Sequence, residues 1–190
     1  MAVGIYGGTF DPIHNGHLIT AQAVLEKRNL EKIIFIPAYI SPLKTEKKHT
    51  ASQHRFAMLE LALEDTPSFI LSDIELKRKN VSYTIDTLKE FKKSYDNIEL
   101  IIGYDNLIVF HKWYKPDKIL ELCKLVVLHR EVDKEPEKKN IYFDKAELLD
   151  TPLVDISSTE IRLRLANNLP IDDLVPLKVK EYIYKNGLYK

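Results

Sequence analysis

The chain has 190 residues, enough for one domain with a single hydrophobic core and too few for two domains of ordinary size. Its 28 lysines and arginines balance its 28 aspartates and glutamates, so net charge provides no general attraction for nucleic acid or an anionic membrane. No apolar run is long enough to cross a bilayer or form a signal-peptide core, and the single Cys123 cannot form an internal disulfide. These features predict a soluble, cytoplasmic protein with one domain over residues 1–190, in which any anion site is local.

Short apolar runs alternate with longer segments of helical periodicity, which is typical of a parallel sheet with helical crossovers. The predicted strands are, in chain order, Ala2–Tyr6, Lys32–Pro37, Phe69–Ser72, Ile98–Ile102 and Leu125–His129. The helical stretches between the first four are Leu18–Leu25, Phe56–Leu63 and Ile85–Phe91. The pattern predicts an α/β fold with a doubly wound, Rossmann-like parallel sheet, helices on both faces and a helical C-terminal segment.

Two patterns resemble capping boxes, in which a Ser or Thr and a Glu or Gln three residues later cap the start of a helix. Thr50 and Gln53 precede the second helical stretch, and Ser157 and Glu160 precede the C-terminal helical segment. The charged run 131–140 interrupts the alternation of strands and helices, and we expect it to form a solvated surface loop.

The strongest chemical signal follows the first predicted strand. Gly7 and Gly8 leave that strand, and His14 and His17 stand at the start of the next helical stretch. The glycines match neither a Walker loop, which needs Gly-Lys-Ser/Thr, nor the G-x-G-x-x-G dinucleotide fingerprint. Taken singly, the glycines could form a simple turn and the histidines could be solvated. Together, glycines that let the backbone approach a phosphate and imidazoles beside free helix amides predict a phosphate-binding site.

A second candidate follows the fourth predicted strand, where Gly103 precedes Asp105. A doubly wound sheet binds its ligands at the carboxyl ends of the strands, where the strand order reverses. We therefore expect Gly103 and Asp105 to converge with the glycine and histidine stretch.

Two separated motifs carry a family resemblance. The first is Gly7-Gly8-Thr9-Phe10-Asp11-Pro12 followed by His14-Asn15-Gly16-His17, and the second is Ile156-Ser157-Ser158-Thr159-Glu160-Ile161-Arg162. They are similar to the two marks of the nucleotidylyltransferase superfamily, a glycine-rich turn with H-x-G-H and I-S-S-T-x-[IL]-R. Its members transfer a nucleotidyl group from a nucleoside triphosphate to a phosphate-bearing acceptor and release pyrophosphate.

Motifs between these two marks narrow the resemblance. They are Glu75–Arg78, Ser82–Thr84 with Asp86–Leu88, Ile101–Asp105 and Trp113–Tyr114, and the match continues in order to Asn186–Tyr189. In this order they resemble the bacterial nicotinate mononucleotide adenylyltransferases. Phosphopantetheine adenylyltransferase shares the two end motifs, but it is typically shorter and is not expected to carry both Ser-Tyr-Thr and Trp-Tyr. The resemblance implies transfer of the adenylyl group of ATP to nicotinate mononucleotide, giving nicotinate adenine dinucleotide and pyrophosphate in NAD biosynthesis.

The resemblance also implies roles for individual residues. The catalytic groups would be His14, His17, Lys44 and Arg162. The ATP-binding residues would be Gly7, Gly8, Thr9, Phe10, His14, His17, Gly103, Asp105, Ile156, Ser157, Ser158 and Arg162. The residues that bind nicotinate mononucleotide would be Lys44, Tyr83, Thr84, Trp113 and Tyr114. Trp113 would stack on the pyridine ring, and the backbone at Thr84 and Tyr114 would meet its carboxylate.

Three of these residues have a structural alternative. Trp113 could be a core residue, Arg162 could be an arginine on a helix surface, and Asp105 could cap the next short helix. Sequence spacing does not decide between these readings and the functional ones.

The chemistry of the acceptor predicts the mechanism. The phosphate of nicotinate mononucleotide is already an ionised nucleophile, so direct in-line attack needs no covalent enzyme intermediate and no general base. Positioning and electrostatic stabilisation of the leaving pyrophosphate are the remaining tasks. We expect Mg²⁺ to be carried by ATP and no dedicated metal site in the protein, since magnesium prefers phosphates and water to an all-protein cage.

Two positions depart from the family pattern. The loop Ala38–Lys44 keeps its lysine but has Leu43 where the family usually has histidine, and His111 replaces a frequent proline and has no assigned role. Two other functions stay open: a non-catalytic nucleotide-binding regulator, and an adenylyl- or cytidylyltransferase with a different phosphorylated acceptor. Both histidines of H-x-G-H are present, which favours an enzyme. The sequence leaves the oligomeric state open, a homo-oligomer included.

Overall fold

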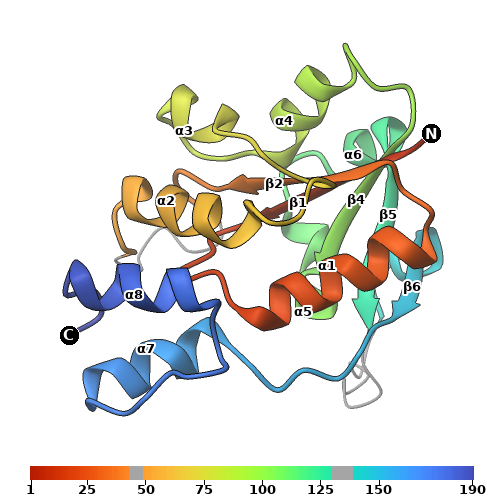
Figure 1. Cartoon of the computed structure of the whole chain (residues 1–190). Coiled ribbons are helices and arrows are strands. Elements are labelled where there is room, and N and C mark those ends of the chain that lie inside the picture. The colour runs from red at the N-terminus through yellow and green to blue at the C-terminus, as the bar shows by residue number, and fades with distance from the viewer. Residues whose placement is uncertain (43–48, 130–138) are drawn as a thin grey trace.

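The computed structural model describes residues 1–42, 49–129 and 139–190, which contain a six-stranded sheet (Figure 1). The strands are β1 (Val3–Gly8), β2 (Lys32–Pro37), β3 (Phe69–Leu71), β4 (Ile98–Gly103), β5 (Lys124–His129) and β6 (Ala146–Asp150). Their order is β3-β2-β1-β4-β5-β6, and every neighbouring pair is parallel. This order confirms the predicted doubly wound α/β fold and reverses between β1 and β4.

Helices cover both faces of the sheet, as predicted (Figure 1). They are α1 (Asn15–Lys27), α2 (Ser52–Leu63), α3 (Ile74–Arg78), α4 (Thr84–Phe91), α5 (Tyr104–Ile108), α6 (Pro116–Leu122), α7 (Ser158–Ala166) and α8 (Leu177–Lys185), with 3₁₀ turns at Phe110–Lys112 and Phe143–Lys145. Helices α7 and α8 form the predicted helical C-terminal segment. Within the described ranges, no helix combines the length and the apolar character that crossing a membrane requires.

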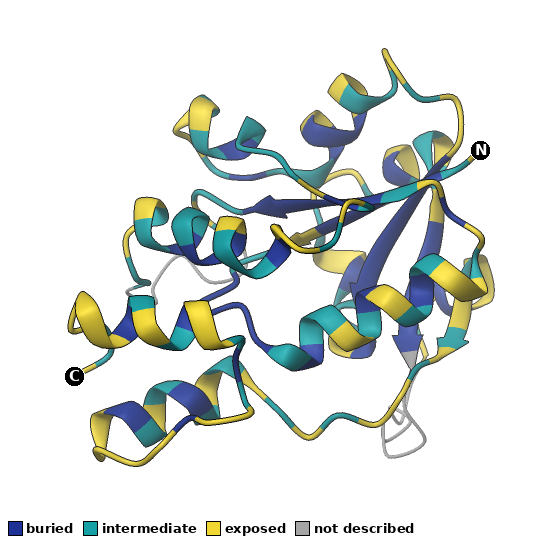
Figure 2. Cartoon of the chain, in the orientation of Figure 1, coloured by how far each residue is buried: buried dark blue, intermediate teal, exposed yellow. Residues whose placement is uncertain are grey.

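Strand side chains alternate between two hydrophobic clusters. Tyr6 and Phe35 point to one face, where they pack with residues of α1, α2, α7 and α8. Ile5 and Ile34 point to the other face and pack with residues of α4, α5 and α6. Figure 2 shows the central strands largely buried, while the helices expose their outer sides. Burial on both faces explains why these strands are continuous apolar runs in the sequence.

Strand β6 has no counterpart among the predicted strands. It is an edge strand, and three of its five residues, Glu147, Leu148 and Asp150, are exposed. An edge strand without a buried residue lacks the continuous apolar run by which buried parallel strands are predicted.

The glycines are placed differently from the prediction. Strand β1 runs through Gly7 and Gly8, which pair with Ile36 and Pro37 of β2, so these glycines end the strand instead of forming a turn after it. A Cβ on Gly8 would lie 2.9 Å from the Phe10 ring. Gly8 therefore permits the chain to fold back closely after the strand.

The two predicted helix caps had different outcomes. Ser157 caps α7, where its hydroxyl accepts from the backbone N–H of Glu160. The Thr50–Gln53 box is wrong, because the N-cap of α2 is Ala51 and it makes no side-chain cap. The backbone N–H and C=O of Thr50 instead bond to side chains of other segments. Most of the predicted loop 131–140 lies outside the described residues.

Candidate active site

A cleft of about 330 Å³ opens at the carboxyl ends of β1 and β4, where the strand order reverses. Its walls come from the end of β1 and the loop after it, the end of β4, α5 and the start of α7. The lining residues are Tyr6, Gly7, Gly8, Thr9, Phe10, Asp11, His17, His49, Ile102, Gly103, Asp105, Asn106, Trp113, Ser158, Thr159 and Arg162. The predicted convergence of the two strand ends therefore occurs at the reversal point, where doubly wound sheets bind ligands.

His14 and His17 cap the start of α1 reciprocally. His14 Nδ1 accepts from the backbone N–H of His17, and His17 Nδ1 accepts from the backbone N–H of His14, each at 3.3 Å. The two rings stack with centroids 3.6 Å apart. Because both Nδ1 atoms are acceptors, the proton of each neutral ring lies on Nε2, which is then a hydrogen-bond donor.

Both imidazoles are neutral at pH 7 in the free protein. Burial lowers the pKa of His14 to about 4. Burial, together with the neighbouring His14, lowers the pKa of His17 well below its usual value. His17 lines the cleft, whereas the stacked His14 is buried and does not. These rings therefore offer donors with fixed tautomers instead of permanent positive charges.

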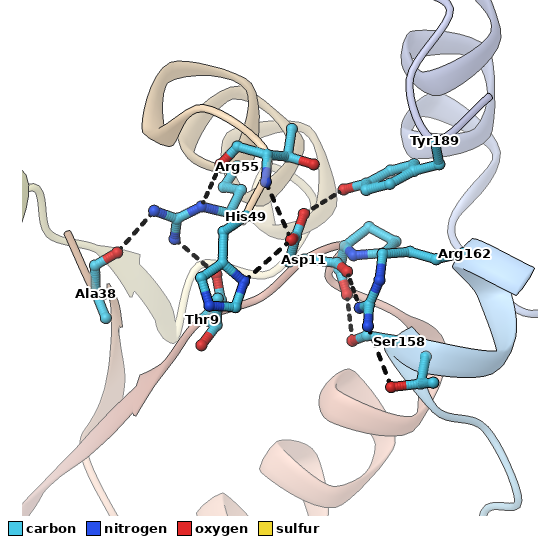
Figure 3. Close-up of polar contacts among 11 residues, drawn as sticks. Thr9, Asp11, Ala38, His49, Arg55, Ser158, Arg162 and Tyr189 are labelled. Carbon is cyan, nitrogen blue, oxygen red and sulfur yellow. Dashed lines mark hydrogen bonds and ion pairs between the residues drawn. The ribbon is translucent and has the colours of Figure 1, made fainter. Parts of the chain in front are cut away.

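Asp11 joins several segments around the cleft (Figure 3). Its Oδ1 accepts from the Tyr189 hydroxyl at 2.7 Å, and its Oδ2 accepts from the Thr50 backbone N–H at 3.2 Å. Oδ2 also lies 3.4 Å from His49 Nδ1, and the Asp11 carbonyl accepts from Arg162 Nη1 at 2.7 Å. Burial opposes ionisation of Asp11, but the hydrogen bonds from Tyr189 and Thr50 outweigh it and lower its pKa. Asp11 is thus an ionised anchor.

The start of α7 is tied to the loop after β1. Besides its bond to the Asp11 carbonyl, Arg162 donates from Nη2 to Thr159 Oγ1 at 3.2 Å. The Ser158 hydroxyl donates to the Pro12 carbonyl at 2.9 Å. Neither hydrogen-bond acceptor of Arg162 carries a formal charge, so its guanidinium remains suited to an anion in the cleft.

A buried arginine holds the loop after β1 from the side of α2. Arg55 on α2 is 2% exposed and donates to three backbone carbonyls, those of Thr50 at 3.0 Å, Thr9 at 2.7 Å and Ala38 at 2.8 Å (Figure 3). It thereby connects the loops that follow β1 and β2 to the segment before α2. Its helical position gave no sign of this role in the sequence, because its partners are backbone carbonyls, and two of them, those of Thr9 and Ala38, belong to other segments.

The other half of the cleft is formed after β4. Gly103 is the N-cap of α5, so Asp105 lies in the first turn and is not its cap; its carboxylate accepts from Asn106 Nδ2 at 3.2 Å. Trp113 both lines the cleft and packs against Phe110, with ring centroids 5.0 Å apart. Trp113 is therefore both a packed residue and a lining residue of the cleft. The Trp113 Nε1 atom is buried and has no hydrogen-bond partner among the described residues.

Comparison with known proteins identifies the family. A family model described as cytidylyltransferase-like matches residues 5–164. A probable nicotinate-nucleotide adenylyltransferase of Caldicellulosiruptor bescii is 45% identical, and the match covers 100% of each chain. The nicotinate-nucleotide adenylyltransferase of Bacillus subtilis is 42% identical, over 99% of this chain and 98% of its own length. The chain belongs to the nicotinate-nucleotide adenylyltransferase family.

Solved structures agree with this fold. The nicotinic acid mononucleotide adenylyltransferase of Plasmodium falciparum, solved in complex with NaAD, has a TM-score of 0.80. It is 22% identical, and the match covers 99% of this chain and 97% of that structure. At this identity the likeness establishes the shared fold of the adenylyltransferase and this chain.

The cleft contains only some of the residues that the family resemblance implied. Those that line it are Gly7, Gly8, Thr9, Phe10, His17, Gly103, Asp105, Trp113, Ser158 and Arg162. Those that are described but do not line it are His14, Tyr83, Thr84, Tyr114, Ile156 and Ser157. Tyr83 and Tyr114 pack against each other with ring centroids 4.7 Å apart, and Thr84 begins α4. Lys44 and Leu43 lie outside the described residues.

Some residues that line the cleft were assigned no role from the sequence. These additional lining residues are Tyr6, Asp11, His49, Ile102, Asn106 and Thr159. Among these six residues, His49 has an unsatisfied polar atom: its Nε2 is buried and has no hydrogen-bond partner in the part of the chain that the structure describes. In that same part, no three His, Cys, Asp or Glu side chains form a group that could hold a metal ion.

Proposed function

We propose that this chain transfers the adenylyl group of ATP to nicotinate mononucleotide, giving nicotinate adenine dinucleotide and pyrophosphate. The observation that carries the proposal is the cleft between β1 and β4, where His17, Arg162 and the two glycines that end β1 line one wall. The names of the relatives, at more than 40% identity over the full length, support the choice of substrates.

ATP supplies the phosphates that this wall suits. His17 would donate from Nε2–H, Arg162 would add a permanent positive charge, and the first amides of α7, at Ser158 and beyond, would favour an anion. His14 fixes the His17 ring by stacking and by capping, and its own contact with ATP stays a prediction. Adenine and ribose would lie toward Gly103 and Asp105.

The acceptor phosphate is the nucleophile, so the enzyme needs no general base. Asp11 is a carboxylate of the loop after β1, and both its oxygens already accept hydrogen bonds, from Tyr189 and Thr50. This arrangement fits direct in-line attack, in which preorganised donors stabilise the charge on the leaving pyrophosphate. Mg²⁺ would enter with ATP and neutralise phosphate charge, because magnesium binds phosphates and water in preference to a protein cage.

The nicotinate ring would occupy the side of the cleft at Trp113, stacked on the indole. Tyr114, the residue after Trp113, packs against Tyr83, and α4 begins directly after Tyr83, at Thr84. The first amides of a helix have no carbonyl partner within it, so those of Thr84 and Ile85 would attract the ring carboxylate. Lys44 remains proposed as a cation for the acceptor phosphate. We also propose that the enzyme acts in the cytoplasm as the single domain predicted from sequence.

Pyrophosphate release with ATP and a panel of phosphorylated acceptors tests this function. We expect turnover with nicotinate mononucleotide and a preference of about tenfold to a hundredfold over its amide in kcat/KM, since a hydrogen bond to a charged group contributes roughly 1.5–3 kcal/mol. The product should be identified as nicotinate adenine dinucleotide by mass. Equal kcat/KM for acid and amide would contradict the carboxylate site, and turnover only with another acceptor would contradict the proposed function.

A further inference from the structure

We propose that Tyr189 is a positioning residue for the cleft, which acts through Asp11 on the loop after β1 and on Arg162. The inference rests on the proposed function, because it concerns the rate of that reaction. Tyr189 follows the last helix and is separated from Asp11 by 178 positions, yet its hydroxyl lies 2.7 Å from Asp11 Oδ1 (Figure 3).

The segment after α8 turns back and brings the Tyr189 hydroxyl to Asp11. Gly187 and Tyr189 have φ values of 59° and 65°, in the left-handed region, and together they turn the chain back after the helix. Leu188 and Tyr189 then pack against the core cluster on the α1 face of the sheet. A left-handed tyrosine is unfavourable by itself, so the contacts of the segment must outweigh its cost.

Asp11, whose carboxylate accepts from the Tyr189 hydroxyl, makes several further contacts. Asp11 is 4% exposed, and its second oxygen holds the Thr50 backbone N–H and faces His49. The carbonyl of the same residue holds the Arg162 guanidinium. The position of Arg162 over the cleft therefore depends on where Asp11 is fixed.

Removing the hydroxyl would leave a buried carboxylate oxygen without its donor. Such an oxygen must find a new partner or water, and either change moves the loop that contains Asp11. The Arg162 bond to the Asp11 carbonyl would move with that loop. A misplacement of about 1 Å at a catalytic group lowers turnover by up to about a hundredfold even when the substrates still bind.

Tyr182 offers a matched comparison within the same C-terminal segment. Its hydroxyl lies 2.9 Å from His54 Nδ1, so it also joins α8 to the body of the protein by one hydrogen bond, between α8 and α2. Neither Tyr182 nor His54 lines the cleft. If the bond of Tyr189 served only to hold the C-terminal segment, the loss of either hydroxyl would have the same consequences.

The test compares Tyr189→Phe, Tyr182→Phe, Asp11→Ala and the double variant Tyr189→Phe/Asp11→Ala with the parent chain. For each protein we would measure kcat and KM for ATP, with nicotinate mononucleotide as acceptor, and the melting temperature, with rates referred to the folded fraction. We expect Tyr189→Phe to lower kcat by about tenfold to a hundredfold with KM changed by less than about threefold. Tyr182→Phe should lower the melting temperature as much and leave kcat within about twofold.

The double variant separates positioning from general support. If Tyr189 acts through the Asp11 carboxylate, removing its hydroxyl in the Asp11→Ala background, where that acceptor is absent, should change kcat by less than about twofold. An undiminished effect in that background, an unchanged kcat in Tyr189→Phe, or an equal loss of kcat in Tyr182→Phe would overturn the inference while the active parent upholds the proposed function. A parent chain inactive with both substrates would overturn the proposed function and this inference with it.

Discussion

The two ends of the sheet each hold a buried carboxylate near an arginine, but they use these charges differently. At the amino end, both oxygens of Glu99 accept from Arg28, at 2.8 and 2.9 Å, and Arg28 also pairs with Glu147 on β6. At the carboxyl end, Asp11 accepts from a hydroxyl and an amide, while Arg162 donates to a carbonyl and a hydroxyl.

The two arginines therefore differ in what they serve: Arg28 stabilises the fold, and Arg162 serves the candidate site. Arg28 bonds to two carboxylates, and the hydrogen bonds that it donates to Glu99 raise its pKa, so its charge is matched within the protein. Arg162 is held in place by uncharged acceptors, which fix its position without neutralising it. A cation that is fixed but has no carboxylate bonded to it suits a substrate anion. The amino end therefore joins α1, β4 and β6, and the carboxyl end presents a site.

Removal of magnesium should have the largest effect, and it should act at the carboxyl end alone. A chelator is expected to abolish adenylyl transfer, because the metal neutralises the phosphates of ATP. The melting temperature of the nucleotide-free chain should not change. Isothermal titration of MgCl₂ into that chain should give negligible heat, and a tight magnesium site there would show that the metal belongs to the protein.

His17→Ala should lower kcat by about 10²–10³ because it removes one preorganised donor to developing charge. The fold should persist, with a small loss from the reciprocal cap at α1. Steady-state kinetics and thermal unfolding would be measured beside His111→Ala, which changes an exposed histidine that does not line the cleft. Near-parental turnover of a folded His17→Ala protein would make His17 a structural cap only.

Glu99→Gln should have the opposite profile. It leaves Arg28 without its charged partner on β4, and we expect a loss of about 2 kcal/mol in the free energy of unfolding, because the Arg28 side chain is partly exposed and keeps its contact with Glu147. Urea unfolding would measure this loss, and kcat should stay within about twofold. A large fall in kcat with parental stability would remove the distinction between the two ends.

Acidification should weaken the folded state through the histidine pair. The pKa of His14 is about 4 in the folded chain, below its ordinary value near 6.5, so between these pH values the unfolded chain binds a proton that the folded chain does not. The free energy of unfolding should then fall with decreasing pH by up to about 1.4 kcal/mol per pH unit for this residue. The contribution is complete above about pH 6.5 and is lost by about pH 4.

The matched variant for this measurement is His14→Asn, because asparagine also caps helices. Urea unfolding of both proteins between pH 7.5 and about pH 4.5 should give a shallower pH dependence for His14→Asn. Parallel curves would mean that His14 does not titrate with the depressed pKa.

The fold was largely predictable because the doubly wound sheet is encoded by local patterns. Buried strands such as β2 appear as short apolar runs, and the helical stretches between them predict that the strands run parallel. Strand β6 was missed because it is an edge strand in which no residue is buried, so it lacks a continuous apolar run. The Thr50 cap failed because the Thr50 backbone N–H donates to the distant Asp11 carboxylate and its carbonyl accepts from Arg55.

The cleft was predictable in outline and not in its internal contacts. The glycines and His17 signalled a phosphate site through their place between a strand and a helix. The mutual capping of the histidines depends on ring orientations that spacing alone does not define. The bonds of Asp11 to Tyr189 and Thr50 join distant segments, so no local pattern contains them.

A crystal structure with nicotinate adenine dinucleotide would test the separation of the two ends most directly. The account predicts that the bridging phosphates lie in the cleft, within about 3.2 Å of His17 Nε2 and of the Arg162 guanidinium. It further predicts the pyridine ring on Trp113 and adenosine at Gly103, with Arg28 and Glu99 unchanged. A dinucleotide whose phosphates contact neither His17 nor Arg162, or which binds at the amino end of the sheet, would contradict it.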